Sequence, residues 1–123
     1  MSRLPYSLPL AGCALADVGG DFHFELVFDD VPKSRLALEG PFRLGTADDP
    51  RHLFEAPYPA WVRDVLLSLV GVLITAARYN RRSSLTISFA DGRTLSVGDG
   101  PFENWHYSND DGVRLHGGAG QVS

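Results

Sequence analysis

Residues 84–97, SLTISFADGRTLSV, alternate apolar and polar side chains on both sides of an Ala-Asp-Gly sequence. Strict alternation is typical of a strand that buries one face, and an Asp-Gly pair is typical of a tight hairpin turn. A three-residue loop at 90–92 opposes Ile87 to Leu95 and places Gly92 at the left-handed position of a bulged turn. A two-residue loop would oppose polar residues to apolar ones. We therefore predict an antiparallel hairpin with the three-residue loop.

A second hairpin is predicted between residues 22–28, FHFELVF, and residues 35–44, RLALEGPFRL, because the phenylalanines and leucines of both stretches fall on even numbers. A loop at 31–33 would place these residues on one face of an antiparallel pair. This register makes three directly opposed pairs: Phe28 with Leu36, Leu26 with Leu38, and Phe24 with Gly40.

The C-terminal stretch at 102–118, FENWHYSNDDGVRLHGG, follows the same rule with its loop at 110–112. Large aromatic residues mostly serve the core, so we interpret its aromatic residues as packing residues. The predicted register opposes Trp105 to Gly117 and Tyr107 to Leu115. The buried face then carries Trp105, Tyr107, Val113 and Leu115, and the other face carries Phe102, His106 and Arg114.

The middle of the chain contains one helical signal. Residues 60–70, AWVRDVLLSLV, carry apolar side chains at helical spacing, with a proline before them and Gly71 after them. Residues 72–79 are β-branched at the start and uncharged up to Arg78, which favours a strand. A continuous helix through both stretches is the alternative, and Gly71 argues against it. Residues 45–59 have no periodicity and are predicted to be loop.

These elements predict an α+β fold: a mainly antiparallel β-sheet of about seven strands, with one short helix packed on one face. A chain of 123 residues has the ordinary size of one domain. We expect a single domain over 1–123, with an ordered core over about 10–117 and a frayed glycine-rich tail over 117–123.

Charge and cysteine content restrict the classes of function. The formal net charge is −4, whereas nucleic-acid-binding domains usually present basic stripes, so we predict no nucleic-acid partner. The same balance suits a basic protein surface as partner. Cys13 is the single cysteine, which rules out an intramolecular disulfide and a cysteine zinc site.

We predict a cytoplasmic protein without membrane attachment. The longest apolar run, at 65–77, falls short of the roughly 20 residues that a membrane-spanning helix needs. The first twenty residues contain one arginine and two prolines, and they make a poor export signal.

The chain has no glycine-rich phosphate loop, no His-Glu-x-x-His pair and no Gly-x-Ser-x-Gly motif, so we predict neither a cofactor nor a catalytic residue. His106 and His116 fall opposite each other near Glu103, and all three are metal-ligand types. Alternation along the strand places Glu103 on the face of Trp105, opposite to the face of the two histidines. We therefore predict no metal site. A carboxylate on that face needs a partner, and Arg93 is the candidate.

Two charged groups are candidate contacts for a partner. Three arginines lie in RYNRRSS at 78–84, a connection between strands, for which a solvated turn is the alternative. Aspartate pairs at 29–30, 48–49 and 110–111 would form an acidic rim if they converge, and such a rim would steer a basic partner. The candidate binding residues are Arg78, Arg81, Arg82, Glu103, His106, Asp110 and Asp111.

Four stretches carry a resemblance to a known family: LALEGPFRL, LLSLVGVLITAA, SLTISFADGRTLSV and FENWHYSNDDGVRLHGG. With its Phe-x-Asp-Gly and Glu-x-Trp motifs, the chain resembles a small family of uncharacterised actinobacterial and proteobacterial proteins over about residues 22–118. It departs from their pattern at His116, where we expect a proline before Gly-Gly. The resemblance implies a similarity to immunity or accessory proteins of bacterial toxin systems, and it carries over no catalytic residue.

The leading hypothesis is a non-enzymatic protein-binding module, of the immunity type or an accessory protein of a toxin system. One alternative is a small hydrolase or isomerase that uses Glu103 and His106, which requires both side chains to meet in one cleft. Another alternative is a homo-oligomeric structural protein, for example a homodimer, that associates through an exposed sheet edge or through the face of Val27.

Overall fold

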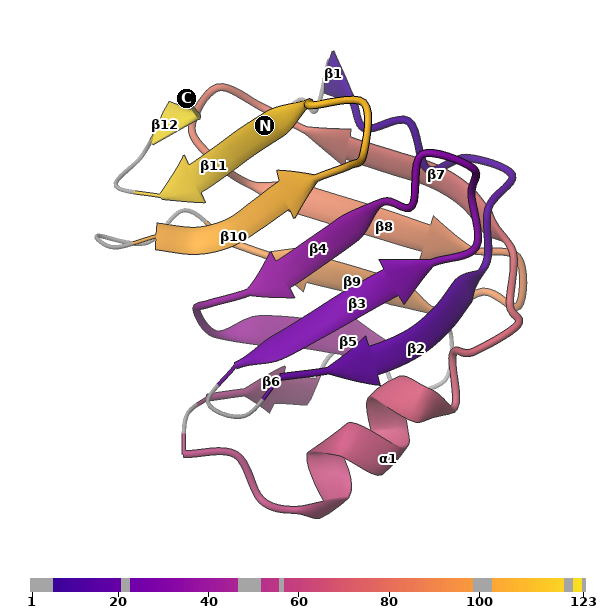
Figure 1. Cartoon of the computed structure of the whole chain (residues 1–123). Helices are drawn as coiled ribbons and strands as arrows, with labels where there is room; N and C mark the ends of the chain where they lie inside the picture. Colours follow the sequence, from indigo (N-terminus) through magenta and orange to yellow (C-terminus); the bar gives the residue numbers. More distant parts are fainter. Residues whose placement is uncertain are drawn as a thin grey trace.

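The computed structural model describes residues 6–20, 23–46, 52–55, 57–98, 103–118 and 121–122. Their strands form two six-stranded sheets that lie face to face as a sandwich (Figure 1), with antiparallel pairing throughout each sheet. Sheet 1 contains, in spatial order, β1 (Tyr6–Ser7), β7 (Ile74–Tyr79), β8 (Leu85–Phe89), β9 (Thr94–Val97), β5 (Phe42–Gly45) and β6 (His52–Phe54). Sheet 2 contains β12 (Gln121–Val122), β11 (Arg114–Gly118), β10 (Glu103–Ser108), β4 (Arg35–Leu38), β3 (Phe24–Phe28) and β2 (Leu15–Gly19).

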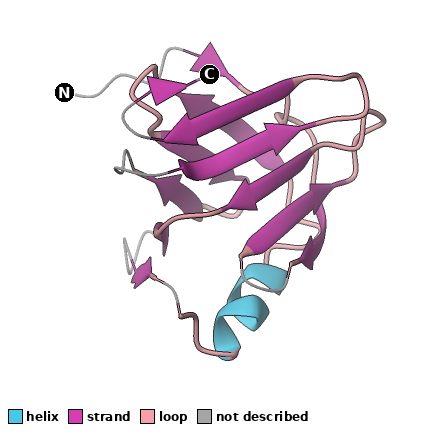
Figure 2. Ribbon diagram, turned by 60° about the vertical axis from the view of Figure 1, so that its left-hand side comes forward, coloured by secondary structure: helices cyan, strands magenta, loops and turns pink. Residues whose placement is uncertain are grey.

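The predicted α+β class is wrong, because the described residues form twelve strands and one short helix, α1 (Trp61–Leu67), and the fold is essentially all-β. Several strands have only two or three residues, so alternation cannot reveal them in the sequence. The helix also does not cover a sheet face. It lies against the edge of the sandwich next to β2 and β6 (Figures 1 and 2).

Two predicted hairpins have the predicted registers. In β8–β9, Ile87 faces Leu95, and Gly92 has a φ of +92°, as the bulged turn requires. In β10–β11, Trp105 faces Gly117, and Trp105 is fully buried between the sheets. Alternation therefore gives the correct buried face for Ile87 and Leu95 in the first hairpin and for Trp105 and Tyr107 in the second.

The β3–β4 hairpin keeps its predicted faces but not its predicted register. Leu26 faces Leu36 rather than Leu38. The connection is longer than the predicted three residues and covers 29–33, with Lys33 in the left-handed region at a φ of +54°. Because the shift is an even number of residues, the buried face of each strand is unchanged.

Residues 35–44 form two strands in different sheets and not one continuous strand. The chain leaves sheet 2 after Leu38 and enters sheet 1 at Phe42, and Phe24 faces Leu38 rather than Gly40. Gly40 packs against Asn104: its N–H donates to the Asn104 carbonyl at 3.1 Å, and a Cβ would lie 2.5 Å from the Asn104 Oδ1. The even-numbered apolar residues stay buried on both sides of this crossing, because the two sheets face the same core.

The helix and the strand after it confirm the prediction for 60–79, and the continuous-helix alternative is wrong. Gly71 follows the helix with a φ of +84° and donates its N–H to the carbonyl of Leu15 at 2.8 Å. β7 then runs as a strand. Within the described ranges, no helix combines the length and the apolar character needed to cross a membrane.

Two segments near the C-terminal hairpin depart from expectation. Val113, expected on the buried face, is 42% exposed because it stands directly after the loop. Residues 121–122 form β12, which pairs with the end of β11, in the stretch for which we expected a frayed tail.

Arg63 of α1 covers the free edge of β2. Its guanidinium donates to the carbonyls of Val18 at 2.6 Å and Gly20 at 2.7 Å, and it lies 5.8 Å from the centre of the Phe24 ring. Carbonyls that accept these bonds are not available to an added strand. The longest edge strand in the described part of the chain is thus protected against pairing with another chain.

The loop between β7 and β8 contains a strained residue. Ser83 has a φ of +72°, which disfavours side chains with a Cβ, and its buried hydroxyl has no hydrogen-bond partner among the described residues. We expect Ser83→Gly to raise the free energy of unfolding by about 1 kcal/mol. Urea denaturation checks this, with Ser84→Gly as a control that should be neutral or destabilising. A loss of stability in Ser83→Gly would contradict the account.

Candidate functional site

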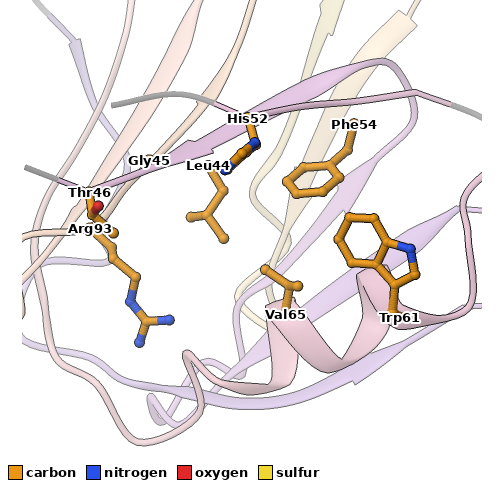
Figure 3. A pocket seen from close by; sticks show the side chains of 8 residues that line it. All are labelled: Leu44, Gly45, Thr46, His52, Phe54, Trp61, Val65 and Arg93. Atoms are coloured by element: carbon orange, nitrogen blue, oxygen red, sulfur yellow. The ribbon is translucent and has the colours of Figure 1, made fainter. Parts of the chain in front are cut away.

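A pocket with a volume of about 360 Å³ lies between β5, β6 and α1 (Figure 3). Pockets of this size hold a small ligand or part of a larger one. Its walls are mainly apolar, and a few polar groups stand at one side. The lining residues are Leu44, Gly45, Thr46, His52, Phe54, Trp61, Val65 and Arg93.

Regular secondary structure positions the apolar wall. Trp61 and Val65 are four residues apart in α1 and therefore share one helix face. Leu44 and Phe54 are the inward-facing residues of β5 and β6. The Trp61 ring contacts the Phe54 ring edge-on, with centroids 5.7 Å apart. Trp61 is nevertheless 56% exposed, so a large aromatic surface remains open at the rim.

Arg93 closes the opposite side of the pocket, and its guanidinium is already engaged. It lies 2.7 Å from the Asp91 carboxylate and donates to the Ser68 Oγ at 2.6 Å and the Ser68 carbonyl at 3.0 Å. Hydrogen bonds from Arg93 hold the pKa of Asp91 below its usual range. Arg93 therefore joins the β8–β9 loop to the end of α1, and the pocket suits an uncharged apolar group.

The three arginines near the β7–β8 loop have different surroundings. Arg81 donates to the Tyr6 hydroxyl at 2.6 Å and lies 5.6 Å from the centre of that ring. Arg78 belongs to β7 and is exposed, and Arg82 is exposed in the loop.

Two of the three acidic tips lie side by side. The Asp110 N–H donates to the Pro32 carbonyl at 2.6 Å, which joins the β10–β11 and β3–β4 loops, and the Asp110 carboxylate lies 3.3 Å from Arg35. Asp111 is exposed on the same loop. The third pair, at 48–49, lies outside the described residues. The acidic tips lie beyond the C-terminal end of β10 (Figure 1). The β7–β8 loop lies near the other end of this strand, where its Ser83 carbonyl accepts a hydrogen bond from the Trp105 Nε1–H.

His106 and His116 face each other across β10 and β11, as predicted, with ring centres 3.9 Å apart. The register shifts between Glu103 and Trp105, so strict alternation does not extend from Trp105 to Glu103. The Glu103 side chain lies outside the described residues. Arg93, its expected partner, binds Asp91 and Ser68. In the described part of the chain, no group of three or more metal-ligand side chains gathers.

Sequence reasoning missed the pocket. Its β6 wall falls within residues 45–59, which we expected to be loop, and three residues are too few to show a period. Trp61 has helical spacing with the buried residues of α1, so the sequence indicated a core position. Within the described ranges, no element covers Trp61, and its side chain is therefore largely exposed.

The model of a family of unknown function, DUF6188, matches residues 6–121. The chain belongs to DUF6188. This DUF6188 protein matches no curated protein and no solved structure. The family description gives no activity, so the expectation of an uncharacterised family is confirmed and the likeness to immunity proteins stays a hypothesis.

Proposed function

We propose that this DUF6188 protein is a protein-binding module and that its pocket receives an apolar side chain of the partner. The observation that carries the proposal is an apolar pocket between β6 and α1 with the exposed indole of Trp61 at its rim. Exposed tryptophans beside a pocket are typical of residues that dominate the affinity of protein interfaces. The engaged guanidinium of Arg93 disfavours a charged occupant.

The finer hypothesis is an immunity-type role in the bacterial cytoplasm, in which the partner is a toxin whose active surface is covered. Its support is the resemblance of the sequence motifs, the small size and the acidic balance. Native co-purification with the product of a neighbouring gene tests it. A Trp61→Ala variant that retains the same partner with equal affinity would contradict the role of the pocket.

A direct test uses N-acetyl-phenylalaninamide as the probe and ¹H–¹⁵N NMR as the readout. We expect the probe to shift the amide signals of Phe54 and Val65, and Trp61→Ala to weaken binding roughly tenfold, equivalent to about 1.4 kcal/mol. Leu67→Ala is the matched control, because Leu67 is an exposed apolar residue of the same helix that does not line the pocket. Equal weakening by both variants, or equal shifts with N-acetyl-lysinamide, would overturn the proposal.

A further inference from the structure

The outer face of sheet 1 carries a row of directly opposed residues. Arg78 of β7 faces Thr86 of β8. Thr86 faces Ser96 of β9, and Ser96 faces Arg43 of β5. Directly opposed residues share one face of a sheet. The alternate residues of these strands are buried, for example Ile87 and Leu95, so the row points to solvent.

This face is built from short hydroxyl-bearing and small side chains. A second row places Ala76 opposite Ser88 and Ser88 opposite Thr94. Thr75, at a register irregularity in β7, donates its hydroxyl to the Ser88 carbonyl at 3.2 Å. The described residues between the two arginines have short side chains that are partly exposed.

Two arginines flank the hydroxyl residues. Arg43 and Arg78 are both exposed, and neither guanidinium has a hydrogen bond or an ion pair with the residues that the structure describes. Three strand spacings separate them, roughly 14 Å. None of the described strand residues on this face is acidic, although the chain has 15 acidic and 11 basic residues. Among the described strand residues of this face, the positive charge of the two arginines therefore has no acidic neighbour.

We infer that the outer face of sheet 1 binds an acidic protein surface through Arg43 and Arg78. A guanidinium presents a planar fork that matches a carboxylate, and the Thr86 hydroxyl between the two arginines is a donor and acceptor type that suits a polypeptide backbone. A net charge of −4 disfavours binding of a long polyanion such as a nucleic acid, because much of the protein surface would repel it. A short acidic segment needs to match only the two arginines of this face. Leu53 faces Arg43 and is 44% exposed, so it extends the face with an apolar contact.

This inference does not depend on the pocket, because the pocket lies on the inner side of β5 and β6 and Arg43 and Leu53 are on the outer side. Loss of binding at one site would leave the other site intact. The acidic partner also differs from the basic partner that the overall charge suggested.

The test uses a fluorescein-labelled dodecapeptide of alternating Glu and Thr, measured by fluorescence anisotropy at low and high NaCl. We expect the R43Q/R78Q double variant to bind the peptide about tenfold more weakly than the native chain at low salt. At high salt, where ions screen the charges, we expect the two proteins to bind it about equally. Lys33→Gln combined with Arg114→Gln is the matched control, because it changes the net charge equally at exposed sites away from this face. We expect less than about a twofold change in the control.

The amide signals of Thr86 and Ser96 should shift with the peptide in the native chain and not in R43Q/R78Q. Circular dichroism melting establishes that both double variants fold. Equal weakening in the control, or unchanged binding in R43Q/R78Q, would overturn the inference. Tighter binding of a twelve-nucleotide oligothymidylate than of the peptide, lost in the same variant, would assign the face to nucleic acid and overturn it as well.

Discussion

Trp105→Ala is expected to lower the free energy of unfolding by about 4 kcal/mol, a large part of the stability of an ordinary domain. Trp105 is fully buried, and its ring centre lies 5.6 Å from that of Tyr79 in the opposite sheet. Its Nε1–H donates to the Ser83 carbonyl at 2.7 Å. Truncation therefore leaves a cavity between the sheets and a buried carbonyl without its donor.

Urea denaturation followed by circular dichroism measures this effect. Trp61→Ala is the matched control, since Trp61 is the other tryptophan of the chain and is largely exposed. We expect the control to change the free energy of unfolding by less than about 1 kcal/mol. Similar losses in the two variants would show that Trp105 does not have the special role in packing that its burial indicates.

Gly117→Ala is the second large effect, with an expected loss of about 3 kcal/mol. A Cβ at Gly117 would lie 2.1 Å from the Cε2 and Nε1 atoms of Trp105. The indole cannot move aside cheaply, because it is fully buried and held by its hydrogen bond to Ser83. The added methyl group must therefore displace either the indole or the backbone of β11.

Two comparisons isolate this contact. Gly19→Ala is the control, because Gly19 also lies in a strand and a Cβ there meets no atom within 4 Å. In the Trp105→Phe background, the smaller ring leaves room for the methyl group, so Gly117→Ala should have a smaller effect than in the native chain. Additive losses in this double-mutant cycle would contradict the steric explanation.

The homo-oligomer hypothesis meets an obstacle at the edges that the structure describes. Arg63 binds the carbonyl of Val18 in β2 and that of Gly20 just after it, and β1, β6 and β12 have at most three residues. A short or covered edge offers little to strand addition. Contact through a sheet face, such as the outer face of sheet 1, is a more accessible route for a partner.

The alternation of apolar and polar residues was the most reliable sequence evidence for which face of a strand is buried. The side-chain period of a strand is two, so even a hairpin with the wrong loop length, such as β3–β4, keeps its buried face. Strict alternation does not extend to Glu103, because the register shifts between Glu103 and Trp105 at a point that the sequence does not indicate. The same alternation is present on both sides of Gly40, where the chain passes from sheet 2 to sheet 1, so the sequence pattern does not indicate the change of sheet.

Local sequence alone determined the loops of the β8–β9 and β10–β11 hairpins, the buried faces of β3 and β4, and the short helix, because each depends on neighbours within a few residues. Only the tertiary structure decided that there are two sheets, that α1 lies at an edge beside an open pocket, and that Arg43 and Arg78 share one face. Those arrangements depend on which strands pair across long separations in the chain. Pairing of that kind is set by the fit of the whole core and leaves no periodic trace in any single stretch of residues.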